Sequence, residues 1–200
     1  MKAKVLVLLL TLIALPQWPF AAEDNEDDWV LEGLDPPKDS WYVKEGDCGE
    51  ACLWTVCNYL SKNLSEEQIN AVAGSPGRGV HSDEIITILK KLKIRHNDIS
   101  EMTSIPSSFL RKKVVGGIKK GNPVLLGFKI YPDEHPEWAC DHFVLVVGCN
   151  EKNEELIYNS NNSRQRISLE KLLNTDHGYS IISKSKFVFG IQLELGKKKP

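Results

Sequence analysis

A cysteine at the start of a predicted helix is the first feature of this sequence that could do chemistry. Cys48 lies in the segment GDCGEAC (46–52), and apolar residues recur at helical spacing over 49–61. A thiol attacks as its thiolate, and the N-terminal end of a helix favours negative charge. A lone cysteine in this setting is more commonly structural, so a nucleophile requires a second group that accepts its proton.

His142 is the histidine best placed to be that second group. It lies at the start of a strongly apolar predicted strand, and a polar ring at the mouth of a buried strand can face a helix start. A third group orients the ring in such nucleophile–base pairs. Asn159, Ser160 and Asn161 end the next predicted strand, and alternation places Asn159 and Asn161 on one face. Together, the helix start and an imidazolium predict a nucleophile pKa well below that of a free thiol.

The cysteine content leaves other interpretations open. The five cysteines are Cys48, Cys52, Cys57, Cys140 and Cys149. An odd number in an exported chain fits one free reactive thiol with two disulfides, or several buried free thiols. The side chains of His135, Cys140 and His142 are suitable zinc ligands, but their spacing matches no common zinc pattern. The sequence therefore predicts no metal site and no cofactor.

The first 22 residues have the pattern of a secretory signal peptide. Lys2 and Lys4 precede an apolar run at 5–15, and small residues follow at 21–22. The run is shorter than the roughly 20 residues that span a bilayer. We expect cleavage near Ala22 and a secreted or periplasmic protein that is not attached to a membrane afterwards. Loss of the two lysines changes the net charge from −2 to −4, which does not favour a nucleic-acid partner.

The rest of the chain reads as one domain with helices first and strands later. An acidic, proline-rich arm is expected at 23–40, a single domain at 41–195 and a basic tail at 196–200. Helices are predicted at 49–61, from a capping box that begins at Ser65, and at 81–94, 106–121 and 168–173. Strands are predicted at 123–130, 142–149, 155–159 and 186–195. This order indicates an α+β fold with helices packed against one side of an antiparallel sheet.

Four segments carry a resemblance to a known family. GDCGEACLWTVCNYL (46–60) resembles the nucleophile helix of the double-glycine, or bacteriocin-processing, cysteine peptidases and of a small guanylyl-cyclase-like branch. DHFVLVVGCN and LIYNSNN are similar to the histidine strand, glycine turn and acid or amide strand of those families, and GNPVLLGF resembles the preceding strand. The resemblance covers roughly 41–162. It implies a papain-like fold in which N-terminal helices pack on an antiparallel β-sheet.

The resemblance also implies roles for individual residues. Cys48 would be the nucleophile, His142 the general base, and Asn161 or Asn159 the orienting amide. An ungapped alignment with the guanylyl-cyclase-like branch places Asn159 or Ser160 at the orienting position. Tyr42 stands at the oxyanion-hole position, six residues before the cysteine, where such peptidases have Gln. Loss of one oxyanion donor can reduce a rate by about 10²–10³. The implied function is a secreted papain-like cysteine hydrolase, a peptidase or amidase, that acts on a peptide or protein through a Cys-His-Asn triad.

Other functions remain open from the sequence. The missing Gln favours a catalytically silent, peptidase-like binding protein. A guanylyl-cyclase-like family member of unknown activity is a further alternative, although no pair of metal-binding carboxylates and no convincing nucleotide loop supports it. Asn161-Asn162-Ser163 is also a glycosylation sequon. A glycan on Asn161 would favour Asn159 as the orienting residue.

Overall fold

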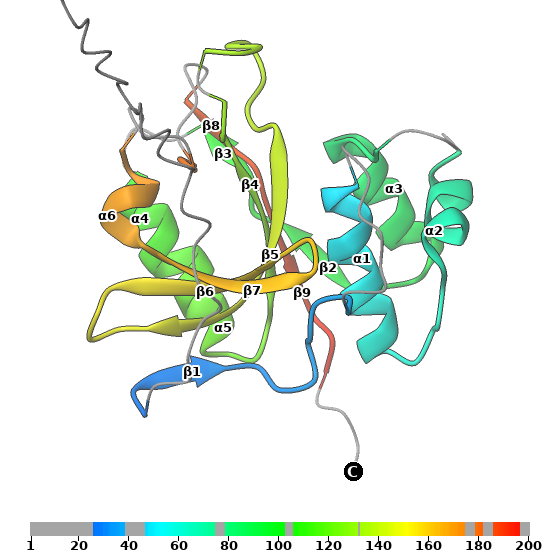
Figure 1. Ribbon diagram of the computed structural model, residues 1–200, viewed down its shortest axis with the longest axis horizontal. Coiled ribbons are helices and arrows are strands. Elements are labelled where there is room, and N and C mark those ends of the chain that lie inside the picture. Colours follow the sequence, from blue (N-terminus) through cyan, green and yellow to red (C-terminus); the bar gives the residue numbers. More distant parts are fainter. Residues whose placement is uncertain are drawn as a thin grey trace, which may run out of the picture.

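An antiparallel sheet lies between two groups of helices (Figure 1). The structure is a computed structural model of the chain, and it describes residues 26–38, 47–74, 79–102, 106–131, 133–174, 179–181 and 186–196. The predicted signal peptide and Tyr42 lie outside these ranges, and so does most of the predicted basic tail. In the described residues, no helix is long and apolar enough to cross a membrane.

The first group of helices is formed by α1 (Cys48–Tyr59), α2 (Glu66–Ala73) and α3 (Ser82–Lys91). The predicted capping box at the start of α2 is present, because the Ser65 side chain accepts from Gln68 N while Gln68 accepts from Ser65 N. Helices α1 and α3 match their predicted ranges to within three residues at each end, and α2 begins next to the predicted cap.

The main sheet has seven strands, and every pairing in it is antiparallel. Its strands are β1 (Asp28–Val30), β2 (His96–Asp98), β4 (Val124–Phe128), β5 (His142–Asn150), β6 (Glu155–Ser160), β7 (Ser163–Ser168) and β9 (Gly190–Leu193). Their spatial order is β2-β9-β4-β5-β6-β7, with β1 paired to β5. A separate small sheet pairs β3 (Glu101–Met102) with β8 (Phe187–Val188). The predicted α+β class with an antiparallel sheet is confirmed.

Side chains alternate along β5 between two hydrophobic cores. Phe143, Leu145 and Val147 pack in the core that contains α1, where Leu53 and Val56 are fully buried. Val144 and Val146 pack in the opposite core. The buried central strand therefore has apolar residues on both faces, which explains its continuous apolar sequence.

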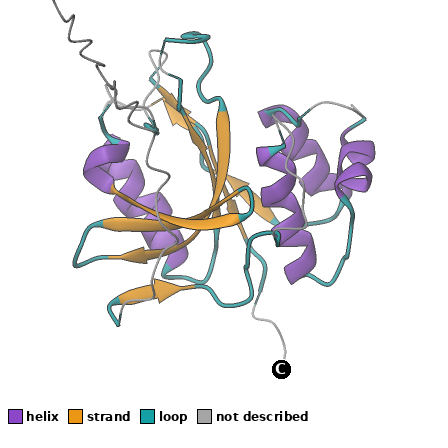
Figure 2. Cartoon of the chain, in the orientation of Figure 1, coloured by secondary structure: helices purple, strands orange, loops and turns teal. Residues whose placement is uncertain are grey.

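Helices cover both faces of the sheet (Figure 2), which corrects the prediction that they pack against one side. The second group comprises α4 (Pro106–Phe109), the π-helical η1 (Leu110–Val115), α5 (Gly116–Ile118) and α6 (Leu169–Leu172). Its apolar residues, among them Phe109, Leu110, Val114 and Ile118, are buried against the sheet. The helical segment continues through Gly116 and Gly117.

The described residues before α1 are also attached to the sheet. Asp28 in β1 forms an ion pair with Arg166, and it accepts a hydrogen bond from Asn150. Leu34 is only 2% exposed and packs in the core that contains α1. Part of the segment that the sequence assigns to an arm thus contributes a strand and a core residue.

Candidate active site

The start of α1 lies against the start of β5, and this contact brings Cys48 to the histidine strand. Cys48 is the first residue of α1, and its Sγ accepts a hydrogen bond of 3.4 Å from the backbone N–H of Phe143. A Cβ on Gly49 would lie 2.4 Å from Cγ2 of Val80. Glycine at 49 therefore permits the close packing of the start of α1 against Val80.

His142, the neighbour of Phe143, is oriented by a different residue from the two that the sequence favoured. Its Nε2 lies 2.8 Å from Oγ of Ser160, the last residue of β6. Ser160 is only 8% exposed, so this hydrogen bond is largely shielded from water. The bond fixes one ring nitrogen and leaves Nδ1 as the other nitrogen that could accept a proton.

The hydrogen bond of the His142 ring is with Ser160 and not with either candidate asparagine. Asn159 is buried; its Nδ2 donates to the carbonyl oxygen of Leu34 at 2.8 Å, and its Oδ1 accepts from Nε of Arg164 at 3.2 Å. Asn161 has a φ of 52° in the two-residue turn between β6 and β7, a left-handed conformation that Asn tolerates. Its Oδ1 is buried without a hydrogen-bond partner. A role for either amide in orienting His142 stays a prediction.

The thiol is hydrogen-bonded to the residue that follows His142, but no direct bond joins the thiol to the imidazole among the described residues. Among the described residues, the bond of the Cys48 thiol is with Phe143 N and that of the His142 ring is with Ser160. Phe143 packs on the side of α1, and His142 is the first residue of β5. Because catalytic hydrogen bonds are often long or misaligned before substrate binds, this arrangement is compatible with proton transfer from Cys48 to His142.

Burial keeps both groups neutral in this arrangement. It raises the pKa of Cys48 to about 11, and the hydrogen bond from Phe143 N lowers the pKa only in part. Burial likewise lowers the pKa of His142 to about 4, against an opposing effect of the Asp141 carboxylate. The predicted low thiol pKa is therefore wrong for this state of the site, because desolvation outweighs the helix start.

The cysteines form no disulfides, and no zinc site is present among the described residues. All five cysteines are free thiols, and Cys52, Cys57 and Cys149 are buried. Of the two interpretations that the sequence allowed, the structure thus has several buried free thiols without disulfides. Within the described residues, no three His, Cys, Asp or Glu side chains gather in a way that could hold a metal ion. His135 instead stacks on Trp138, with ring centroids 4.1 Å apart.

The segment that contains Cys48 is similar in sequence to a known peptidase family. The sequence profile of the Peptidase C39 family matches residues 41–114, which include Cys48 and α1. The chain is similar to the Peptidase C39 family. This match confirms the predicted resemblance to double-glycine peptidases. His142 and Ser160 lie beyond the matched residues, so their assignment depends on the structure. No curated protein matches the chain.

Solved structures of Peptidase C39 proteins share the fold. A putative C39-like peptidase from Bacillus anthracis is 12% identical with a TM-score of 0.56, and the match covers 86% of this chain and 99% of that chain. A double glycine motif protease from an AMS/PCAT transporter, solved in complex with the leader peptide, is 16% identical with a TM-score of 0.52. That match covers 82% of this chain and 96% of the other. The papain-like fold is therefore confirmed over most of the chain.

Proposed function

We propose that this protein is an exported papain-like cysteine peptidase whose nucleophile is Cys48 and whose general base is His142. The observation that carries the proposal is the hydrogen bond from Phe143 N to the Cys48 thiol, which joins the helix start to the residue after His142. The similarity of residues 41–114 to the Peptidase C39 family supports the same nucleophile.

The proposed reaction begins with proton transfer from the thiol. Nε2 of His142 is engaged with Ser160, so Nδ1 accepts the proton as the sulfur attacks the carbonyl carbon of a peptide bond. The imidazolium and the thiolate attract each other, which offsets part of the cost of forming two charges in a buried site. His142 then donates the proton to the leaving amine, and water hydrolyses the resulting thioester with the same imidazole as base.

Two features of this proposed site differ from a Cys-His-Asn triad with a Gln donor. Ser160 holds the ring in place of Asn159 or Asn161, the two residues proposed from the sequence. The oxyanion would be bound by the backbone N–H of Cys48 and by the hydroxyl of Tyr42, which lies outside the described residues. Fewer or weaker donors imply a slower enzyme than one with Gln at that position.

The substrate is proposed to be a peptide or protein segment. One structural neighbour is a double glycine motif protease in complex with the leader peptide, and this likeness supports a peptide ligand for the same fold. Nucleic acid and membrane are not proposed as partners. Export remains a proposal from residues 1–22, and N-terminal sequencing of protein recovered from the culture medium or periplasm tests whether the chain begins near Glu23.

The deciding experiment compares Cys48→Ala with Cys149→Ala. Cys149 is a buried thiol in the core on the opposite side of the sheet, so its loss controls for general effects of removing a cysteine. We expect wild type and Cys149→Ala to hydrolyse peptides of a mixed library, and mass spectrometry follows the products. Cys48→Ala should show none. His142→Ala should reduce the rate by about 10²–10⁴.

A silent peptide-binding protein is the second candidate, because the pKa of Cys48 is raised to about 11 and its thiol is not hydrogen-bonded to His142 among the described residues. Such a protein would retain library peptides equally well with Ala at 48 and would hydrolyse none of them. Binding without hydrolysis in wild type would select this candidate over the peptidase.

A further inference from the structure

A buried ion pair lies directly before His142, and the proposed chemistry does not use it. Nζ of Lys129 is 2.8 Å from Oδ2 of Asp141, and the two side chains are only 4% and 9% exposed. By contrast, the ion pair between Lys119 and Glu151 lies at the surface. A buried pair often stabilises a fold no better than apolar residues in the same place, so stability alone does not account for it.

The Asp141 carboxylate joins the end of β4 to the start of β5, the two strands that the loop 129–141 connects. Its Oδ1 accepts a hydrogen bond of 2.7 Å from Ile130 N, and its Oδ2 accepts one of 3.2 Å from Tyr131 N. The backbone N–H of Asp141 also donates to the carbonyl oxygen of Phe128 at 3.0 Å. Phe128 is the register partner of His142, so these bonds fix the backbone from which the histidine ring projects.

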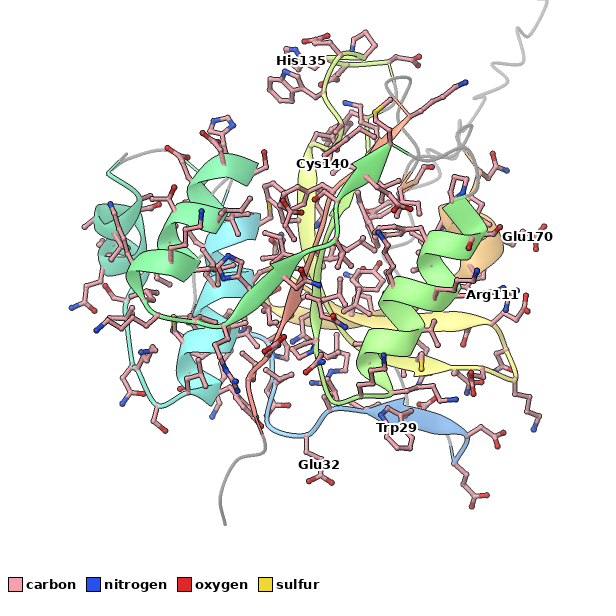
Figure 3. The ribbon with its side chains drawn as sticks, turned by 180° about the vertical axis from the view of Figure 1, so that it is seen from behind. Trp29, Glu32, Arg111, His135, Cys140 and Glu170 are labelled. Atoms are coloured by element: carbon pink, nitrogen blue, oxygen red, sulfur yellow. The ribbon has the colours of Figure 1, made fainter. Side chains whose placement is uncertain are left out.

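The ammonium of the pair holds the middle of the same loop. Nζ of Lys129 donates to the carbonyl oxygens of Glu134, at 2.6 Å, and His135, at 3.3 Å. Residues 133–138 are exposed, so no apolar side chain from this stretch anchors the loop in a core. Figure 3 shows His135 at the outer tip of the loop and Cys140 closer to the sheet. The position of the loop therefore depends on the Lys129 side chain.

The inner end of the loop lies beside the thiol. Cys140 packs over Gly127, where a Cβ would lie 2.7 Å from its Sγ, and Gly127 is the register partner of Phe143. Cys48 accepts its hydrogen bond from Phe143 N. The loop held by the ion pair thus borders the nucleophile as well as the base.

We propose that Lys129 and Asp141 are positioning residues that hold the His142 backbone and the loop between β4 and β5 in the place that proton transfer from Cys48 requires. They act through His142 and do not touch the reacting atoms. The catalytic consequence rests on the proposed peptidase function, whereas the positional statement concerns the structure itself.

The test separates position from stability by comparing single and double variants. Lys129→Met keeps the aliphatic stem but leaves a buried carboxylate unpaired, so it should lower the Tm clearly. Lys129→Met/Asp141→Asn removes both charges, so its Tm should return close to that of wild type. The double variant still lacks the bonds to Glu134 and His135 carbonyls. We therefore expect its rates of Cys48 alkylation by iodoacetamide and of peptide hydrolysis to stay at least about ten-fold low, because small displacements at a reacting centre are costly.

Two readouts do not need catalysis. Amide hydrogen exchange at 133–138 should become at least about ten-fold faster in the double variant, because the loop has lost its anchor. The pKa of His142, followed by NMR of its ring, should fall, because the Asp141 carboxylate raises it in wild type. Glu151→Gln, which breaks the exposed Lys119 pair, is the matched control and should change none of these quantities.

The outcomes distinguish the two proposals. If the double variant had wild-type loop protection and wild-type Cys48 alkylation as well as a wild-type Tm, the positioning role would be overturned. A wild-type protein with no hydrolysis and no preferential labelling of Cys48 would count against the peptidase, and the exchange results would still decide whether the ion pair positions the loop.

Discussion

At the scale of single residues, the neutral His142 ring sets the pH range of the proposed reaction. Only the neutral imidazole can accept the thiol proton, and burial lowers its pKa to about 4. Activity should therefore be lost as the pH falls through about 4, well below the ordinary histidine value near 6.5. The acid limb of kcat/KM against pH measures this directly, and a limb near 6.5 would show that the ring is not buried as described.

The last two residues of β6, Asn159 and Ser160, should respond differently to truncation. Ser160→Ala removes the bond to Nε2 of His142 and should lower kcat about ten-fold or more with little loss of stability. Asn159→Ala removes a buried side chain that bonds to the Leu34 carbonyl and to Nε of Arg164, so it should lower the free energy of unfolding by about 1–3 kcal/mol, although Nη2 of Arg164 still donates to the same carbonyl. Urea unfolding and steady-state kinetics on the same samples separate the two effects.

Asn161→Gly provides the matched comparison at the neighbouring turn. Its φ of 52° is accessible to glycine, and its Oδ1 has no partner to lose. We expect both stability and kcat to change little. A large fall in kcat for this variant, with Ser160→Ala near wild type, would restore the asparagine triad that the sequence favoured.

At the scale of secondary-structure elements, Glu50 connects α1 to its neighbours. The Glu50 side chain is fully buried; its Oε1 accepts from Val80 N at 3.0 Å, and the Asn70 amide of α2 interacts with the same carboxyl. Oε2 of Glu50 and Oδ1 of Asn70 are both buried without a donor. A proton on Glu50 would supply a missing donor, which agrees with the rise of its pKa, caused mainly by burial, to about 7.

The raised pKa of Glu50 predicts a pH dependence of stability. The folded state holds the proton more tightly than the unfolded state, whose pKa is near 4.5. The stabilising contribution is therefore complete below about 4.5 and is lost as the pH rises through 7, by roughly 3 kcal/mol at most.

Glu50→Gln tests this dependence, because it keeps the bond from Val80 and does not titrate. Between pH 5 and 7, its free energy of unfolding should not show the decrease with pH that Glu50 causes in wild type. At pH 8, its free energy of unfolding should exceed that of wild type. Glu32→Gln, at an exposed position, is the control and should follow wild type throughout. If the free energy of unfolding of all three proteins depended on pH in the same way, a raised pKa at Glu50 would be contradicted.

At the scale of the whole molecule, the segment before α1 should be part of the folded domain. A chain that begins at residue 36 lacks β1, the ion pair of Asp28 with Arg166 and the buried Leu34 side chain. Burial of one leucine contributes about 1.5–3 kcal/mol, and Arg166 would also lose its partner. We expect the free energy of unfolding to fall by about 3 kcal/mol or more relative to a chain that begins at residue 26, measured by urea unfolding.

The sequence by itself determined the local features of this protein. The helix that begins at Cys48, the capping box at Ser65 and the buried strand that begins at His142 follow from spacing, capping and apolar content, which act over a few residues. The Cys48 motif also carried the family resemblance. The strand β7, with the polar sequence SRQRIS, escaped prediction because its stability comes from pairing with β6, which local composition does not reveal.

Only the tertiary structure decided which groups meet at the site. The choice of Ser160 over Asn159 as the partner of His142 depends on the register of β5 and β6, and a β-bulge between Val146 and Gly148 shifts that register. The pKa values of Cys48 and His142 depend on burial by residues distant in sequence, and this desolvation outweighed the local effect of the helix start. The register of the strands and the desolvation of the site both depend on many contacts between residues that are distant in sequence. A short motif could therefore not have specified them.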